Sequence, residues 1–422
     1  MHENTLLTPL VIVVVLLFIA ALSAIVVKRI HFPYTVGLVL VGIALGFAAA
    51  NVEFLQPLRE VRLTPEFILF LILPALLFEA AINIHVDILL KNLPGILMLA
   101  TVGLLIAMVI VGISMSGFTP LPLGAALLFG ALISATDPVA VIALFKELGV
   151  SAKLSTLVEG ESLFNDATAI VTFNIILGIV VTGSAFSSGL LVNGIFDFFV
   201  VFLGGLAIGV VLSAIVLWII GLERSDHLVQ ITLTSVLAYV AFIAAEHVFH
   251  LSGVMAAVGA GIVAAWRADK VFDEQMRFHV RAFWEYAAFV ANSLIFLLIG
   301  FTEYHLFEDL THFRQNFVYI LIAIVVVTIA RLLIIYALTP LGNKMSKAEP
   351  VSQSERTVMF WGGLKGAIPL ALVLGLPQDF EHRVLMLDLT LGVVLFSLLV
   401  QGTTTGTLLR RLGLLEAEPS SH

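Results

Sequence analysis

The chain has 422 residues, of which 60% are hydrophobic and 12% are charged, and it contains no cysteine. Soluble domains carry about 25% charged residues, so the composition excludes an ordinary water-soluble protein and indicates a polytopic helical membrane protein. The missing cysteines exclude disulfide bonds and thiol chemistry, and the net charge of −8, without a dense basic run, gives no sign of a nucleic-acid-binding surface.

Thirteen apolar segments follow one another along the chain. A helix of about 20 apolar residues crosses a hydrocarbon layer of about 30 Å, whereas the second and ninth segments are short and rich in glycine, so they need protein neighbours rather than lipid. Gly42 with Gly46, and Gly205 with Gly209, have the spacing that permits close helix packing. The predicted ranges are 6–27, 35–50, 66–84, 94–116, 122–147, 154–182, 195–220, 227–249, 252–266, 278–302, 316–340, 355–376 and 384–408.

The positions of Lys and Arg predict the orientation, because short cytoplasmic loops carry an excess of them. With the N-terminus outside, fifteen of the 21 lie at cytoplasmic ends and loops, two lie within spans, and four lie outside: Arg59, Arg62, Arg314 and Arg383. The leader before the first segment has no Lys or Arg, so this segment is expected to be a retained span and not a signal peptide. We predict a multi-pass protein of the cell membrane, with a short cytoplasmic tail at 409–422.

Two of the predicted helices are interrupted in their middle. Segment 5 contains Asp137-Pro138 and segment 12 contains GGLKGAIP, and proline removes a backbone donor and ends a helix. The two segments are seven apart, so they run in opposite directions, as inverted repeats at about 6–182 and 227–408 with a linking helix at 195–220 require. Interrupted helices at matching positions of two inverted halves indicate a transporter with its site near the bilayer midplane.

Both interruptions carry a charge suited to a helix end. Asp137 followed by Pro138 is typical of an N-cap followed by proline at the first helical position. Lys365 lies where the first half of segment 12 should end, facing negative carbonyl ends. Each charge can therefore chiefly neutralise a helix end, or it can handle the transported substrate, and the residues alone leave both readings open.

The motif EGESLFNDA in segment 6 places four polar side chains within two helical turns. Ser162 and Asp166 share one face and Glu161 and Asn165 share another, because each pair is four residues apart. A hydroxyl and a carboxylate opposite the unwound backbone near Thr136 offer oxygen ligands, which hard cations such as sodium prefer. Glu79 of segment 3 could add another oxygen.

Arg331 is the strong basic partner within reach of two buried acids. It lies alone in the middle of segment 11, and arginine stays charged at any relevant pH. If Arg331 pairs with Glu161, then Asp166 is the acid left free to titrate. A lone carboxylate that holds either a proton or a cation is the core of an exchange mechanism.

The motifs LPALLFEAA, SATDPVAV, GESLFNDA, IARLL and GGLKGAI occur in this order. Together they resemble the cation:proton antiporter-1 family of sodium/proton exchangers, from about residue 10 to 410. The resemblance implies an all-α fold of thirteen transmembrane helices, an inverted repeat with two crossed discontinuous helices, usually dimeric. It also implies an antiporter and not an enzyme, without a cofactor, which exchanges Na+ or Li+ for H+ in pH homeostasis.

Carried over motif by motif, the resemblance assigns the cation and proton site to Asp166, Ser162, Glu79 and Thr136, the last through its backbone carbonyl. It gives Asn165 and Asp137 supporting roles and makes Glu161 and Arg331 a structural ion pair. Electroneutral members have an Asn-Asp pair, as in Asn165-Asp166, whereas electrogenic relatives have two adjacent aspartates, so one-for-one exchange is expected. Lys365 departs from the arginine that many members have at its position.

Other functions fit the sequence less well. An intramembrane aspartyl protease would need a Gly-x-Gly-Asp motif, and a serine enzyme would need the second glycine that GESLF lacks. A channel is usually built from symmetric subunits around a filter. A K+/H+ exchanger of the same fold remains an alternative. His247 and His250, at the outer end of segment 8, are candidates for pH sensing, although histidines at a helix end more often lack such a role.

Overall fold

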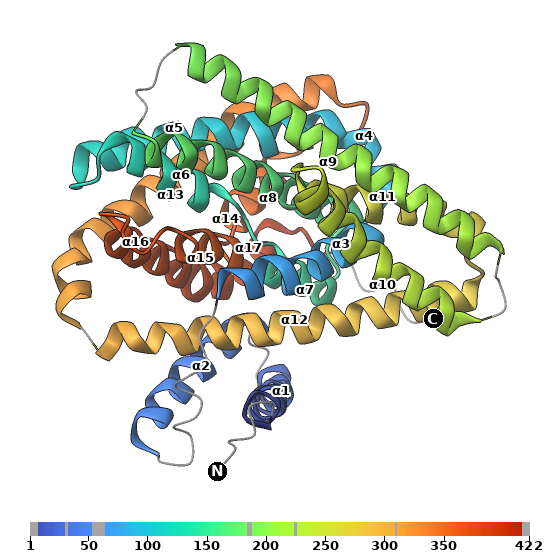
Figure 1. The fold of residues 1–422 in the computed structure, drawn as a ribbon, viewed down its shortest axis with the longest axis horizontal. Coiled ribbons are helices and arrows are strands. Elements are labelled where there is room, and N and C mark those ends of the chain that lie inside the picture. Colours follow the sequence, from blue (N-terminus) through green and yellow to red (C-terminus); the bar gives the residue numbers. More distant parts are fainter. Residues whose placement is uncertain are drawn as a thin grey trace.

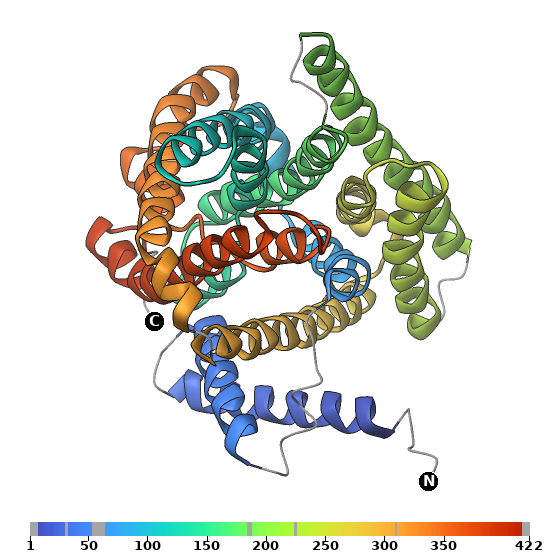
Figure 2. The same cartoon turned by 60° about the vertical axis from the view of Figure 1, so that its left-hand side comes forward.

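The computed structural model describes residues 7–29, 33–52, 64–183, 188–222, 226–308 and 310–415. Within these ranges the chain forms a bundle of helices, and its only β-pairing is an isolated bridge between Val150 and Leu415. The N-terminal helix lies at one margin of the bundle, as both views show (Figures 1 and 2). The all-α prediction is therefore confirmed for the described part of the chain.

Helix covers each of the thirteen predicted segments. In chain order the helices are α1 (Leu7–Arg29), α2 (Tyr34–Asn51), α3 (Leu73–Asn83), α4 (Val86–Leu97), α5 (Leu104–Phe118), α6 (Leu123–Ser134), α7 (Val139–Leu148), α8 (Ala152–Val181), α9 (Ser188–Leu222), α10 (His227–Ile243), α11 (Gly253–Val271), α12 (Glu274–Glu308), α13 (Leu310–Met345), α14 (Gln353–Trp361), α15 (Ala367–Leu374), α16 (Arg383–Phe396) and α17 (Thr403–Leu412). Short π-helical stretches adjoin several of them: η2 (Phe67–Ile72), η3 (Met98–Gly103), η4 (Ala244–Val248) and η5 (Ser397–Gly402).

Eight continuous or nearly continuous helical stretches of the described chain are long and apolar enough to cross a membrane. Three further apolar helices, at Ile12–Val27, Tyr34–Ala49 and Phe67–Asn83, are shorter. A multi-pass membrane protein is therefore confirmed, while thirteen crossings stay a prediction. Of the residues used to orient the chain, Arg59, Arg62 and Arg224 lie outside the described residues, as does 416–422 of the predicted tail.

The fourth segment begins earlier than predicted, at Val86 instead of residue 94. Pro94, the first residue of the predicted segment, lies inside α4. The preceding turn is kept helical by packing, because Leu89 is buried and lies against α8 where Gly160 leaves room for it. Tertiary contact thus overrides the breaking tendency of proline.

Glycines bring the helices on one side of the molecule into backbone contact. A Cβ added to Gly42 of α2 would lie 2.2 Å from the Leu297 carbonyl oxygen of α12. On α9, a Cβ added to Gly205 would lie 2.2 Å from the Ser252 carbonyl oxygen, and one added to Gly209 would lie 2.0 Å from that of Ala256 in α11. The predicted close packing is confirmed at these three glycines.

The two interrupted segments are each split into two short helices. Segment 5 forms α6 and α7 with residues 135–138 between them, and segment 12 forms α14 and α15 with residues 362–366 between them. Residues 362–366 of the second break are all buried, and those of the first break are buried or intermediate in exposure. Non-helical backbone at membrane depth is tolerated only inside protein or along a cavity, so the two breaks require partners, and these partners define the site.

We predict that Gly209→Ala lowers the melting temperature of the detergent-solubilised protein. Its methyl group must push α9 away from the Ala256 carbonyl of α11, a strain that typically costs about 1–3 kcal/mol. Gly178→Ala on α8 is the matched control, because a Cβ there meets nothing within 4 Å and alanine favours helix by up to about 1 kcal/mol. Equal melting of the two variants would show that the α9–α11 contact does not need glycine.

Candidate functional site

The two helix breaks hold each other through their backbones. The Asp137 N–H of the first break donates to the Leu364 carbonyl of the second, at 2.8 Å. The Lys365 N–H donates to the Ser397 hydroxyl of η5 at 3.0 Å. Because a buried backbone group without a partner is costly, these bonds fix the position of one break against the other.

Lys365 bridges the breaks with its side chain. Its ammonium group is buried and donates to the carbonyl oxygens of Ser134 at 3.2 Å and Ala135 at 3.0 Å. These carbonyls end α6, so the prediction that Lys365 faces carbonyl ends of a helix is correct, but the helix is the other broken one. The carbonyl end of its own half-helix α14 is instead bound by Arg331, which donates to Met359 at 3.0 Å.

The Asp137 carboxylate contacts the N-terminal ends of the second half-helices, α7 and α15. Its Oδ1 accepts the Val139 N–H at the start of α7 at 3.0 Å, and its carboxylate also accepts a backbone hydrogen bond from Ala367 at the start of α15. The predicted N-cap position is wrong by one residue, because α7 begins at Val139 and Pro138 precedes it. Gly366 permits this approach, since a Cβ there would lie 1.8 Å from Asp137 Oδ2. One carboxylate therefore faces two positive helix ends.

The polar side chains of α8 satisfy the remaining backbone of the first break. Asn165 Nδ2 donates to the Thr136 hydroxyl at 2.6 Å, and Asn165 Oδ1 accepts the Thr136 N–H at 3.3 Å. The Ser162 hydroxyl donates to the Thr136 carbonyl at 2.6 Å. Thr136, Ser162 and Asn165 are buried. These contacts fix Thr136 against α8, so its carbonyl and the Ser162 hydroxyl lie side by side.

Asp166 faces a cavity of about 90 Å³ between α3, α8, α12 and the first break. The cavity brings together the four predicted ligand residues, since Glu79, Thr136, Ser162 and Asp166 all line it, as does Asp137. Asp166 is 8% exposed and has no hydrogen-bond or ion-pair partner among the described residues, although the charges of Asp137 and Lys365 act on it. It is thus a buried carboxylate whose oxygens face a space large enough for a cation and water.

Two acids of this cavity form a group further along α3 and α8. Glu79 Oε1 accepts a hydrogen bond from Asn83 at 2.9 Å, and Glu159 lines the same cavity from α8. The positive charge of Lys146, in the last turn of α7, acts on both carboxylates. Sequence reasoning missed Glu159, although it precedes Ser162 by three residues and Asp166 by seven and so shares their helical face.

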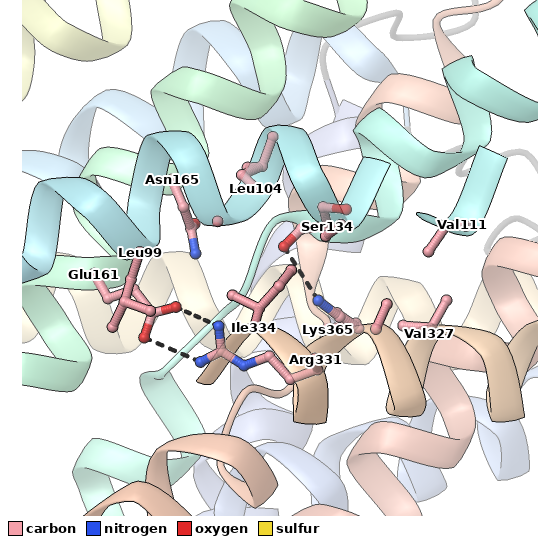
Figure 3. A pocket seen from close by; sticks show the side chains of 13 residues that line it. Leu99, Leu104, Val111, Ser134, Glu161, Asn165, Val327, Arg331, Ile334 and Lys365 are labelled. Carbon is pink, nitrogen blue, oxygen red and sulfur yellow. Dashed lines mark hydrogen bonds and ion pairs between the residues drawn. The ribbon is translucent and has the colours of Figure 1, made fainter. Parts of the chain in front are cut away.

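The opposite face of α8 carries the structural charges (Figure 3). Glu161 is 2% exposed, and its carboxylate accepts two hydrogen bonds from Arg331. Nη1 donates to Oε1, and Nη2 donates to Oε2 at 3.0 Å. Asn165, Lys365 and Ser134 line the same small cavity of about 20 Å³. The two-faced arrangement predicted from the four-residue spacing is therefore present, with Ser162 and Asp166 on one side and Glu161 and Asn165 on the other.

Other titratable residues lie away from the cavity at Asp166. Asp388 of α16, which sequence reasoning also missed, is buried and accepts a hydrogen bond from Asn316 of α13 at 2.7 Å. An acid in the first half of segment 13 was the signal that could have found it. His247 and His250 are exposed, and His247 packs against Phe70 with ring centroids 5.3 Å apart. A pH-sensing role for these histidines stays a hypothesis.

Comparison with known proteins places this arrangement among transporters. Residues 14–411 match the model of a family described as sodium/hydrogen exchanger, transmembrane. The Na(+)/H(+) antiporter ApNhaP of Aphanothece halophytica is 39% identical over 96% of this chain and 74% of its own length. The Na(+)/H(+) antiporter NhaH of Halobacillus aidingensis is 34% identical over 95% of this chain and 97% of its own length.

A solved structure has a similar fold. The structure of the sodium proton antiporter MjNhaP1 from Methanocaldococcus jannaschii at pH 8 matches with a TM-score of 0.74, covering 97% of this chain and all of that one, at 21% identity. At this identity the likeness extends to the fold and not to individual residues. The site geometry described above therefore rests on this chain's own side chains.

We predict that Glu161→Gln and Arg331→Met each lower the free energy of unfolding in detergent by about 3–5 kcal/mol, because each strands a buried charge. The double variant should recover part of this loss, but not all, since Arg331 also binds the Met359 carbonyl. Lys153→Met is the control: it breaks the Lys153–Glu355 pair, 3.1 Å apart and more open to solvent, and should cost only about 1 kcal/mol or less. Melting of all three single variants at one temperature would contradict the assignment.

Proposed function

This chain belongs to the sodium/hydrogen exchanger family, and we propose that it exchanges Na+ or Li+ for H+ across a membrane by letting the two ions compete for Asp166. The observation that carries the proposal is the state of Asp166 within its cavity. Asp166 is a buried carboxylate to which the described residues offer neither a hydrogen bond nor an ion pair, and it lines one cavity together with Thr136 and Ser162.

The neighbouring charges leave Asp166 as the exchanging group. Glu161 is bound by the Arg331 guanidinium in an ion pair. Asp137 accepts backbone N–H groups from two helix starts, so its carboxylate already has hydrogen-bond partners within the protein. Asp166 has no such partner, so it must take up either a proton or a cation from the cavity.

The oxygens around Asp166 suit a monovalent cation. Carboxylate, hydroxyl and carbonyl oxygens are the ligands of hard cations, and Asp166, Ser162 and Thr136 supply one of each. Glu79 would add a carboxylate from α3, on the side of the cavity where Glu159 also lies. Asn165 acts as a positioning residue, because it holds Thr136 and does not line this cavity.

The charge of the site in its two loaded states determines how many protons are exchanged for each cation. Asp166 with one bound Na+ is neutral, and Asp166 with one bound proton is also neutral, so the site carries the same charge in both loaded states. One cation is then exchanged for one proton, and the cycle moves no net charge. No cofactor takes part in this cycle; Na+ and H+ are the cargo.

Alternating access completes the proposal. The two breaks would cross near the midplane of thirteen spans arranged as inverted repeats at about 6–182 and 227–408, and the helices around Asp166 would move against the glycine-packed helices. We place the N-terminus outside and the C-terminus in the cytoplasm of a cell membrane, from the distribution of Lys and Arg. A homodimer is the expected assembly.

We predict that Asp166→Asn abolishes sodium-driven pH recovery in reconstituted vesicles while the protein stays folded, because the amide keeps the shape and loses both proton and cation binding. Asp388→Asn is the control, since Asp388 is a buried acid outside the cavity and its amide oxygen can still accept from Asn316. It should retain exchange. Normal pH recovery by the Asp166→Asn protein would remove the proposed mechanism.

We also predict that the exchange rate is independent of membrane potential. A cycle that moved one net charge would be driven or opposed by about 2.3 kcal/mol per 100 mV, and the proposed one-for-one cycle moves none. Vesicles clamped with potassium and valinomycin at several potentials test this, after potassium itself has been shown not to be transported. A rate that rises steadily with potential would mean that a second proton is carried, with Glu79, Asp137 or Glu159 as its carrier.

A further inference from the structure

Asn292 of α12 lines the cavity that holds Asp166 and carries a buried side-chain oxygen. Its Oδ1 atom is shielded from solvent and has no hydrogen-bond partner among the described residues. Asn292 is also the residue through which α12 lines this cavity, which Glu79 of α3 and Asp166 of α8 line as well. Other buried side-chain atoms without a partner, such as Thr35 Oγ1 and Thr172 Oγ1, belong to residues that do not line it.

The next residue on α12, Ser293, has different neighbours from Asn292. Ser293 bonds with the Tyr34 hydroxyl at 2.7 Å and donates to the Phe289 carbonyl. It therefore joins α12 to α2, on the side where these helices pack through Gly42 and Gly300. Asn292 lines the cavity instead, so two adjacent polar residues serve different neighbours.

An amide oxygen at this position is costly unless it receives a partner. Leaving a buried acceptor without a hydrogen bond destabilises the protein, and such groups in proteins are normally satisfied by protein, water or ligand. An amide carbonyl is also a ligand type that hard cations accept alongside carboxylates and hydroxyls. The cavity that Asn292 lines is the one in which we place the transported cation.

We propose that Asn292 supplies a neutral oxygen ligand to the transported monovalent cation and so helps to set the affinity for Na+ or Li+. This inference rests on the proposed function of Asp166. Because the amide carries no charge, it strengthens cation binding without changing the one-for-one stoichiometry. It also ties the cation to α12, so that the bound ion contacts both α8 and the helix that packs on α2.

A ligand role makes a distinct kinetic prediction. A neutral oxygen binds Na+ directly, whereas the proton binds Asp166 itself, so losing the oxygen should raise the Na+ concentration for half-maximal exchange and leave the maximal rate nearly unchanged. A merely structural role would lower the maximal rate and the melting temperature instead. The two roles therefore separate in the KM and the maximal rate.

The experiment compares Asn292→Ala, Asn292→Leu and Ser293→Ala in vesicles, with Na+ and Li+ titrated at fixed pH. We expect the KM for Na+ to rise about tenfold in both Asn292 variants, because each loses one oxygen ligand whose contribution is similar to that of a hydrogen bond. In Ser293→Ala the KM should stay within about twofold of the parent value. Leucine matches asparagine in size, so this variant keeps the cavity wall if alanine does not fold. Asn292→Asp restores an oxygen and should bring the KM back to or below that of the parent.

The outcomes are separable from those for Asp166. An unchanged KM in Asn292→Leu, with Asp166→Asn inactive, would overturn the role of Asn292 and leave the proposed function standing. An active Asp166→Asn protein would instead remove the site on which this inference rests. Binding supplies a second readout: Na+ should raise the melting temperature of the parent in detergent, and a rise of equal size at the same Na+ concentration in Asn292→Leu would also contradict the proposal.

Discussion

The structure depends on satisfying the backbone of two helix breaks inside an apolar bundle. Neither break can turn to water, so each uses the other and the charges around it: Asp137 N–H on the Leu364 carbonyl, and Lys365 on the carbonyl end of α6. Asp137 in turn accepts from the first residues of α7 and α15. The negative charge faces two positive helix ends and the positive charge faces a negative one, so each charge is placed where it neutralises helix ends.

The two other acids of this region, Glu161 and Asp166, differ in whether they have a cationic partner. Glu161 is neutralised by Arg331, which also binds the carbonyl end of α14. One arginine thus binds both a carboxylate and a helix end. Asp166 is left with the cavity as its environment, and burying an ion without a partner is expensive. In the proposed mechanism this carboxylate binds either Na+ or H+, and the competition between the two ions is the chemical basis of exchange.

The division of α8 into two faces explains why these roles do not interfere. Glu161 and Asn165 hold the protein together on one face, while Ser162 and Asp166 meet the cavity on the other. Helical geometry enforces the separation, because residues four apart share a face and residues one apart do not. The charged Arg331 guanidinium is bound to Glu161 on the far face, so it does not pair with Asp166.

Much of this arrangement could be predicted from the sequence, because it follows from local rules. Apolar length locates the helices, Pro138 and the glycines of GGLKGAIP locate the breaks, and helical spacing pairs Ser162 with Asp166. What could not be predicted depends on tertiary contact between distant segments. The α4 helix continues through Pro94 because it packs against α8, and Lys365 binds the end of α6 instead of α14. No sequence motif marks Asn292, and only the structure shows that it lines the cavity.

The central claim is that Na+ and H+ compete for one carboxylate. The most direct test adds Na+ to the purified protein in weakly buffered detergent solution and measures the protons released, since cation binding to a protonated ligand must release its proton. At a pH where the site is protonated, the account predicts release of about one proton per bound Na+, and none in the Asp166→Asn protein. Undiminished proton release by Asp166→Asn, or Na+ binding to the parent without any proton release, would contradict it.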